Sequence, residues 1–210
     1  MSTARNTPLY YPNRFAHDLF AAMDEVMGKH GLDATLGMAG LDAYIDNPPP
    51  DDLERGFSFE SIAGLNRALD EMYGQRGGRG MAIRAGRAWF AEGMKSFGAL
   101  RGIGDPAFRA LPLEERCRLS LNAITEIFTR FSDQATHLEE DGAFFRVVAS
   151  PSPFAYGRRA ERPVCHPLVG LLQEHLRWAS NGREFVVRET HCAATGESAC
   201  IFVINKHPTG

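Results

Sequence analysis

The sequence predicts an α+β fold in which helices pack on an antiparallel, twisted sheet, and three observations lead to this prediction. Before residue 140, apolar residues recur mainly at the spacing of amphipathic helices. After residue 140, segments rich in β-branched and aromatic residues alternate with turn residues, as strands do. One amphipathic stretch, residues 167–179, lies between these strand segments. Helices first and strands later, with a single helix among the strands, are typical of α+β domains.

Length and composition limit the class of protein. The chain has 210 residues, which is enough for one domain with a full core. Its net charge of −3 and pI near 6.2 give no bulk electrostatic reason to expect nucleic acid or an anionic membrane as partner. The N-terminus lacks the layout of a secretory signal, and no apolar run reaches the ~18–20 residues that span a bilayer. We therefore expect a cytoplasmic protein with no direct nucleic-acid or membrane partner.

The N-terminal segment, residues 1–57, is expected to be mainly helical. Asn13 is positioned to cap a first amphipathic helix, and Gly31 is its stop signal. A shorter helical piece follows at 34–45 and ends in 46–52, where three prolines prevent a helix. Because the apolar stripe of the first helix must be buried, we expect this helix to be a docking or dimer element. The stripe consists of Phe15, Leu19, Met23 and Val26 or Met27.

A glycine-rich segment lies between two further helices. Ser58 caps the first of them, which carries apolar residues on one face. Residues 73–90, YGQRGGRGMAIRAGRAWF, have five glycines with arginines between them, which invites comparison with a phosphate-binding loop. Such a loop follows a strand and carries Lys before Ser or Thr, and neither condition holds here. We therefore favour a turn that leads into a helix, in which Gly86 and Gly93 permit close packing.

The last helix before the strands begins near Pro112, with acidic residues in its first turn. Cys117 lies on its apolar stripe with Leu121 and Phe128, so we expect this thiol to be a packing residue. The strands expected later in the chain are 142–157, broken at the sequence SPSP, and then 183–192 and 199–206.

The other three cysteines form a pattern that indicates a metal site. If 183–192 and 199–206 pair as a hairpin about Gly196, then Cys192 and Cys200 face each other at about 5 Å between Cβ atoms. Cys165 precedes the 167–179 helix, where the helix dipole favours a thiolate. In a reducing compartment, clustered thiols point to metal, catalysis or burial rather than to structural disulfides.

Tetrahedral zinc needs a fourth donor, and the candidates near the hairpin are Glu189 and His191. In a regular strand both side chains project to the face opposite Cys192. Glu189 can reach the thiols only if a bulge, or the end of the strand, lies between it and Cys192. Strand geometry alone does not choose between the two residues.

The C-terminal motif resembles the 4-vinyl reductase domain, a small-molecule-binding module related in fold to a Golgi transport-complex subunit. The resemblance covers roughly residues 60–205, and the glycine-rich segment 73–90 is also similar. In the sensory domains of bacterial activators of aromatic catabolism, which this half of the chain resembles, three cysteines and a glutamate bind structural zinc. The resemblance thus implies Cys165, Glu189, Cys192 and Cys200 as ligands. The residues that carry it are Pro163, Val164, Cys165, Gly170, Arg188, Glu189, Thr190, Cys192, Gly196 and Cys200.

The resemblance and the residues together favour a binding module over an enzyme. The N-terminal segment 1–57 would join a small-molecule-binding domain, 58–210, in one globular unit. We expect a zinc-braced sensor for a hydrophobic ligand, aromatic or hydrocarbon, that acts as a homodimer or through an effector protein in trans. The candidate ligand-binding residues are Trp89, Phe128, Phe131, His137, Phe144, Phe145 and His166.

Two alternatives remain open at this point. The first is a tetrapyrrole carrier or sensor, which would bind haem or a bacteriochlorophyll precursor through an axial histidine such as His137, His166 or His175. The second is a reductase acting on a tetrapyrrole vinyl group, the reaction that gave the family its name. The sequence has no dinucleotide fingerprint and no flavin or iron–sulfur pattern to deliver electrons, which disfavours the reductase.

Overall fold

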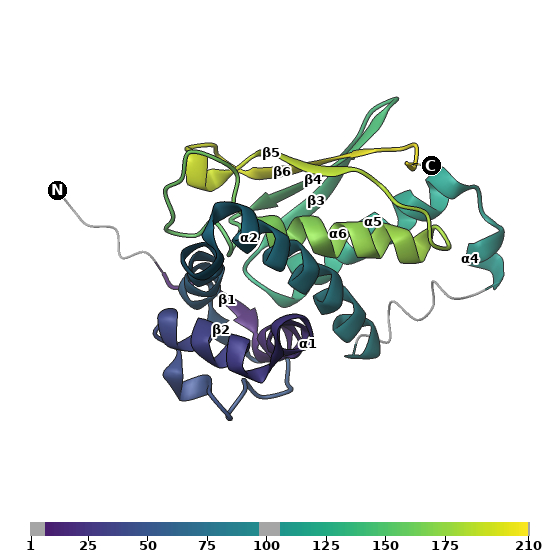
Figure 1. Ribbon diagram of the computed structural model, residues 1–210. Coiled ribbons are helices and arrows are strands. Elements are labelled where there is room, and N and C mark those ends of the chain that lie inside the picture. The colour runs from purple at the N-terminus through teal and green to yellow at the C-terminus, as the bar shows by residue number, and fades with distance from the viewer. Residues whose placement is uncertain (1–6, 97–105, 210) are drawn as a thin grey trace.

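A four-stranded antiparallel sheet lies over two layers of helices (Figure 1). The computed structural model describes residues 7–96 and 106–209. No helix within these ranges is long and apolar enough to span a bilayer. The elements are β1 (Tyr10–Pro12), α1 (Asn13–Met38), η1 (Asp42–Tyr44), β2 (Arg55–Ser58), α2 (Phe59–Ser96), α4 (Pro106–Ala110), α5 (Leu113–Phe131), β3 (Ala135–Glu140), β4 (Phe144–Ser150), α6 (His166–Ala179), β5 (Val187–His191), η3 (Ala193–Thr195) and β6 (Cys200–Asn205).

The order of strands in the main sheet is β3-β4-β6-β5, and every neighbouring pair is antiparallel. The predicted α+β class with an antiparallel sheet is therefore confirmed. The segment predicted at 142–157 forms only β4, which ends at Ser150 just before the SPSP prolines. The chain then runs without strand structure through residues 151–165 and enters α6. This long connection brings Cys165 back under the sheet.

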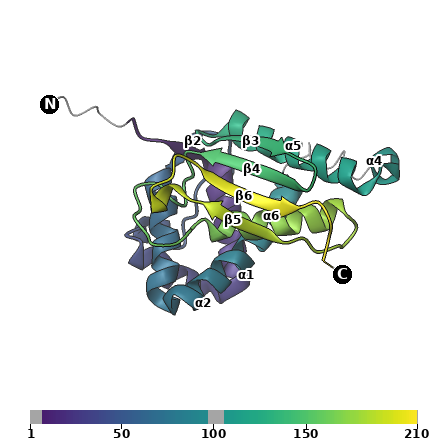
Figure 2. The ribbon, with the colours of Figure 1, turned by 90° about the horizontal axis from the view of Figure 1, so that it is seen from above.

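Helices α5 and α6 cover one face of the sheet, and α2 lies between α6 and α1 (Figures 1 and 2). The crossing of α2 and α6 is a backbone contact. A Cβ atom on Gly86 would lie 2.0 Å from the carbonyl oxygen of Pro167, and one on Gly170 would lie 2.0 Å from that of Ile83. The predicted close packing at Gly86 is confirmed. At Gly93 a Cβ atom would meet nothing within 4 Å, so the same prediction there is wrong.

Glycine kinks sit elsewhere than predicted. Helix α1 continues past Gly31 to Met38 and breaks instead at Gly28, whose φ of 75° only glycine adopts readily. Helix α2 breaks at Gly74, with φ of 68°, and the rest of the glycine-rich segment is helical rather than a turn. Ser58 accepts the predicted cap bond from the Ser61 N–H at 3.0 Å.

Two N-terminal predictions are wrong in detail. The residue that caps α1 is Pro12, because the Asn13 side chain instead donates to the Asp52 carboxylate at 2.9 Å. The shorter helix predicted at 34–45 belongs to α1 up to Met38 and then to the short η1 turn.

The hydrophobic core joins the helical layers to the sheet. The α1 stripe residues Phe15, Leu19 and Met23 are at most 5% exposed and belong to the same cluster as the residues under the sheet. Cys117 is 1% exposed within this cluster, and burial raises the pKa of its thiol to about 11. Its predicted role as a packing residue is confirmed.

Candidate metal centre and ligand cavity

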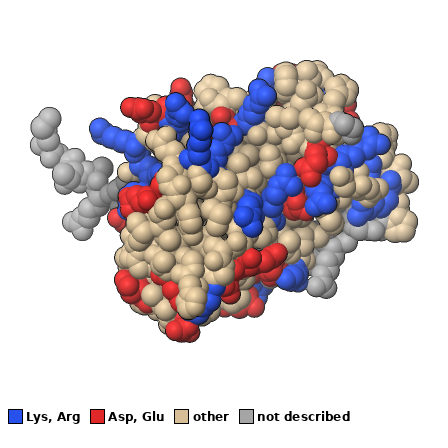
Figure 3. Space-filling model, viewed as in Figure 1, with Lys and Arg blue, Asp and Glu red and all other residues tan. Residues whose placement is uncertain are grey.

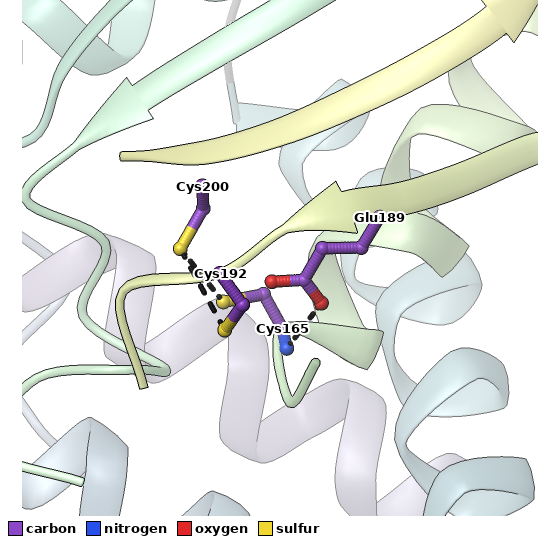
Figure 4. A group of neighbouring side chains, drawn as sticks. All are labelled: Cys165, Glu189, Cys192 and Cys200. Atoms are coloured by element: carbon purple, nitrogen blue, oxygen red, sulfur yellow. Dashed lines mark hydrogen bonds between the residues drawn. The ribbon is translucent and has the colours of Figure 1, made fainter. Parts of the chain in front are cut away.

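Four side chains from separate elements meet below the C-terminal hairpin (Figure 4). Cys165 caps α6, Glu189 lies in β5, Cys192 follows β5, and Cys200 begins β6. One ligand atom from each residue lies within 4.8 Å of all the others. The structure therefore brings together the four residues that the sequence motif singled out.

The hairpin has the geometry that this meeting requires. Glu189 pairs with Phe202 and His191 with Ile201, and the register shifts between Glu189 and His191. This bulge is the irregularity that the sequence argument required for Glu189 to face the thiols. The Sγ atoms of Cys192 and Cys200 lie 4.0 Å apart, as expected for residues facing each other across a hairpin. The turn uses η3 and Gly196, whose φ is 100°.

His191, the other candidate for the fourth donor, lies outside the cluster. Its side chain is exposed, and its Nδ1 lies 3.0 Å from the hydroxyl of Thr190. Among the described residues, the structure therefore selects Glu189 over His191 as the carboxylate or imidazole nearest the three thiols.

Hydrogen bonds hold the four groups in place. The Sγ atoms of Cys165 and Cys200 are 3.5 Å apart, and the backbone N–H of Cys165 donates to Glu189 Oε2 at 2.8 Å. The backbone N–H of Ala193 donates to the Cys200 sulfur at 3.3 Å. Glu189 Oε1 is buried and has no hydrogen-bond partner among the described residues. A buried carboxylate oxygen without a partner is costly, and a bound cation would satisfy it.

Burial controls the protonation of the cluster. Burial raises the pKa of the Cys165 thiol well above its ordinary value and that of Glu189 to about 8. The hydrogen bond with Cys165 lowers the pKa of Cys200, but the bond with Cys192 and burial outweigh it and raise that pKa to about 12. Hydrogen bonds with Cys165 and Cys200 hold the pKa of Cys192 well below its ordinary value. Without a cation, the cluster therefore keeps most of its protons at neutral pH.

The donor set and spacing fit tetrahedral zinc. A Zn–S bond of about 2.3 Å places two thiolates of one tetrahedron about 3.8 Å apart. The observed Sγ–Sγ distances of 3.5 Å and 4.0 Å bracket that value. Three thiolates and a carboxylate are the ligands that a structural zinc takes, and they would leave no position for a water molecule.

Sequence reasoning missed two residues that support this site. The hydroxyl of Ser152 lies 3.2 Å from the Cys165 sulfur. The side-chain amide of Asn66, in α2, donates to the carbonyl of Val164 at 2.8 Å and so fixes the approach to Cys165. Both contacts join residues far apart in the chain, and neither side chain belongs to a motif.

A small apolar cavity of about 50 Å³ lies between α1, α2, α5 and α6. Two of the predicted ligand-binding residues, Trp89 and Phe128, line it. The Trp89 Nε1 donates to the carbonyl of Phe15 at 2.9 Å, which leaves only the apolar ring face to the cavity. The lining residues are Phe15, Asp18, Trp89, Phe90, Gly93, Ile124, Ile127, Phe128 and Leu171.

The other predicted ligand-binding residues do not line this cavity. Phe131 is half-buried at the end of α5, under the guanidinium of Arg130. Phe144 is half-buried, and Phe145 is fully buried below the Lys206 ammonium, which lies 4.9 Å from its ring centre. His137 is exposed on the edge strand β3. His166, the first residue of α6, lines a separate, charged cleft.

Solved structures share this fold at low sequence identity. The phenol-responsive sensory domain of the transcription activator PoxR, solved with phenol, is 16% identical, with a TM-score of 0.50 over 69% of this chain and 72% of that chain. A structure from a study of haem distortion in the H-NOX family is 13% identical, with a TM-score of 0.57 over 95% of this chain and 97% of that one. An H-NOX protein from S. oneidensis is 9% identical, with a TM-score of 0.54 over 92% and 99%.

The sequence comparisons concern the C-terminal part of the chain. The chain matches no curated protein. The model of the 4-vinyl reductase domain matches residues 145–206, from β4 to the end of β6. This range contains all four residues of the thiol and carboxylate cluster. The chain thus belongs to the 4-vinyl reductase family through the domain formed by residues 145–206.

Proposed function

We propose that this protein is a zinc-braced sensor module that binds a small hydrophobic ligand, aromatic or hydrocarbon. The observation that carries the proposal is the apolar cavity walled by Phe15, Trp89, Phe90 and Phe128 in a chain with a 4-vinyl reductase domain. The phenol-responsive domain of PoxR has a similar fold and was solved with phenol, which supports an aromatic ligand here.

The cavity also supports a joint role for the two segments of the chain. Phe15 comes from the N-terminal helical segment, 1–57, and Trp89 and Phe128 come from the segment 58–210. We propose that the two segments act as one unit, because the ligand would contact both. A cytoplasmic location, a homodimer and an effector protein in trans belong to the same proposal.

The size of the cavity links ligand binding to a change of shape. Its volume of about 50 Å³ is smaller than the roughly 150 Å³ of an engineered cavity that holds benzene. A ring-sized ligand must therefore move part of the wall. A second void lies behind Ile124, Phe128 and Leu171, which border both spaces, so rotation of Phe128 would enlarge the first cavity. A ligand that moves α5 relative to α1 gives the module a readable signal.

Asp18 gives the cavity a polar group. This carboxyl lies in the wall, and burial is the main cause of the raised pKa of Asp18. A protonated carboxyl can donate or accept a hydrogen bond, so it would favour a hydroxylated aromatic over a plain hydrocarbon. Comparing phenol with ethylbenzene tests this preference.

Zinc would brace the module rather than catalyse. Cys165, Glu189, Cys192 and Cys200 would hold the ion and fix α6 to the hairpin β5–β6. The bound ion would supply structural stability, because four protein donors complete its coordination. A thiol used as a ligand is no longer free to act as a nucleophile, which disfavours a thiol-dependent enzyme.

Calorimetric titration of phenol and ethylbenzene into the full chain tests the hydrophobic ligand. We expect saturable binding that changes when the cavity wall is altered by Phe128→Ala. The matched control is Phe131→Ala, because Phe131 lies on the same helix but outside the cavity wall. Absence of binding by both compounds, or an equal effect of both substitutions, would remove the proposal.

A tetrapyrrole is the second candidate, because the fold resembles that of H-NOX proteins over most of this chain. His175 is the histidine best placed for it. The ring is fully buried, neither nitrogen has a hydrogen-bond partner among the described residues, and burial lowers the pKa of His175 to about 4. Phe90, which lines the cavity, lies 5.1 Å from this ring, centre to centre. A Soret band on adding haemin, lost in His175→Ala, would favour this candidate; its absence would exclude it.

A further inference from the structure

A large cleft of about 810 Å³ lies where α2, the 151–165 connection and β5 meet. It does not overlap the apolar cavity described above. Figure 3 shows Lys and Arg side chains gathering over the upper left of the molecule. Six arginines line the cleft: Arg76, Arg79, Arg158, Arg159, Arg162 and Arg188.

The charges of the cleft are unbalanced. Its lining has six arginines against three acidic residues, Asp70, Glu161 and Glu189, which leaves +3, whereas the chain as a whole carries −3. Within residues 7–96 and 106–209, the only one of the six with an ion pair is Arg158, which contacts Asp70 at 2.8 Å. Like charges gathered in a concave surface repel one another, so an anion bound among them would be favourable.

Arg158 gives independent evidence for a missing anion. Its side chain is only 9% exposed. One guanidinium nitrogen, Nη2, donates to Asp70, while the other, Nη1, is buried without a hydrogen-bond partner among the described residues. A buried cationic donor without an acceptor is costly, and an anion in the cleft would supply that acceptor.

We propose that this cleft binds a small polyanion that carries phosphate or carboxylate groups. Guanidinium groups bind both kinds of group in bidentate geometry. The volume falls within the roughly 300–1,000 Å³ of small-molecule sites. The site is concave rather than a flat basic surface, which favours a small ligand over an acidic peptide or nucleic acid. The arginines of the glycine-rich segment, Arg76 and Arg79, thereby acquire a role without a phosphate-loop motif.

The arginines also have a second potential role, which the test must separate. Glu189 borders the cleft, so the positive charge could simply offset a metal site with three thiolates and a carboxylate. In that case, removing arginines would reduce metal content and leave the cleft without affinity for anions. This inference does not depend on the hydrophobic ligand, which would occupy another cavity.

The test is calorimetric titration of pyrophosphate and of citrate into the full chain as purified, with metal content measured in each sample. The variant is Arg79→Ala/Arg188→Ala, which removes two exposed arginines from different elements. The matched control is Arg84→Ala, an exposed arginine of α2 outside the cleft. Melting temperatures check that the variants stay folded.

We expect saturable binding by the wild type, weaker at high salt, with a loss of about tenfold or more in the double variant and none in Arg84→Ala. Stronger binding of pyrophosphate would identify a phosphate ligand, and stronger binding of citrate a carboxylate ligand. Binding of neither probe to the wild type would overturn the proposal. Equal affinity in the wild type and the double variant would also overturn it, as would loss of metal without a change in anion affinity.

Discussion

Glu189 Oε2 accepts a hydrogen bond from the backbone N–H of Cys165 at 2.8 Å, which joins β5 to the first turn of α6. The bond uses one oxygen of the carboxylate and leaves Oε1 buried beside the sulfur atoms. It also occupies a backbone donor at the N-terminus of α6, where negative charge is favourable. Glu189 thus connects the sheet to the helix even before a metal is considered.

The pH dependence of stability of the metal-free protein should report on Glu189. Burial raises the pKa of Glu189 from 4.5 to about 8, so the folded state holds this proton more tightly than the unfolded state. The resulting stabilisation is complete below about pH 4.5 and is lost as pH rises through about 8. Unfolding of the chelator-treated protein by urea between these pH values should therefore show stability falling with pH.

Glu189→Gln is the control for this measurement, because the amide oxygen can still accept from Cys165 but does not titrate. Its metal-free form should show a smaller decline of stability with pH. Added zinc should have the opposite effect in the wild type, since its ligands bind deprotonated and the stabilisation it gives grows with pH. Identical pH profiles for the metal-free wild type and Glu189→Gln would contradict the assignment.

The crossing of α2 and α6 should tolerate no side chain. Gly170→Ala would place a Cβ atom 2.0 Å from the carbonyl oxygen of Ile83, so the helices must separate. We expect a loss of about 1–3 kcal/mol or more in the free energy of unfolding, measured by denaturant titration. Gly93→Ala is the matched control, because its Cβ atom meets nothing within 4 Å. It should be neutral or gain up to about 1 kcal/mol, since alanine favours a helix; a larger loss than at Gly170 would be inconsistent with this packing.

Helix α1 should contribute to stability rather than act as a free tail. Phe15, Leu19 and Met23 are buried against the rest of the core, and Phe15 also borders the apolar cavity. Deletion of residues 1–31 should therefore lower the melting temperature or change the elution volume. Leu19→Ala, a smaller change, should cost about 2–5 kcal/mol. An unaltered melting temperature and elution volume in the truncated protein would show that this helix is dispensable.

Local patterns in the sequence predicted the metal cluster well. Cys192 and Cys200 are equally spaced from Gly196, so a hairpin necessarily brings them together. The need for a bulge beside Glu189 followed from the alternation of side chains in a strand. The stripe of α1 and the burial of Cys117 followed from helical periodicity. Each of these predictions depends on residues close together in the chain.

The features that sequence reasoning missed depend on contacts between distant segments. Strand β3, ATHLEE, is polar and becomes a strand because it pairs along β4. The α1 kink falls at Gly28 rather than Gly31, a choice that packing decides among nearby glycines. The basic cleft combines arginines from three parts of the chain, so no single segment indicated it.

Zinc content per chain is the most direct test of the metal centre. Elemental analysis should find one zinc in the wild type and a loss of zinc in the Ser variants of Cys165, Cys192 and Cys200, with a loss of several kcal/mol in stability. Cys117→Ser should keep its zinc, because that thiol packs in the core at 1% exposure, away from the cluster. A wild type without stoichiometric metal, or a Cys117→Ser protein that loses zinc while Cys192→Ser keeps it, would contradict the account.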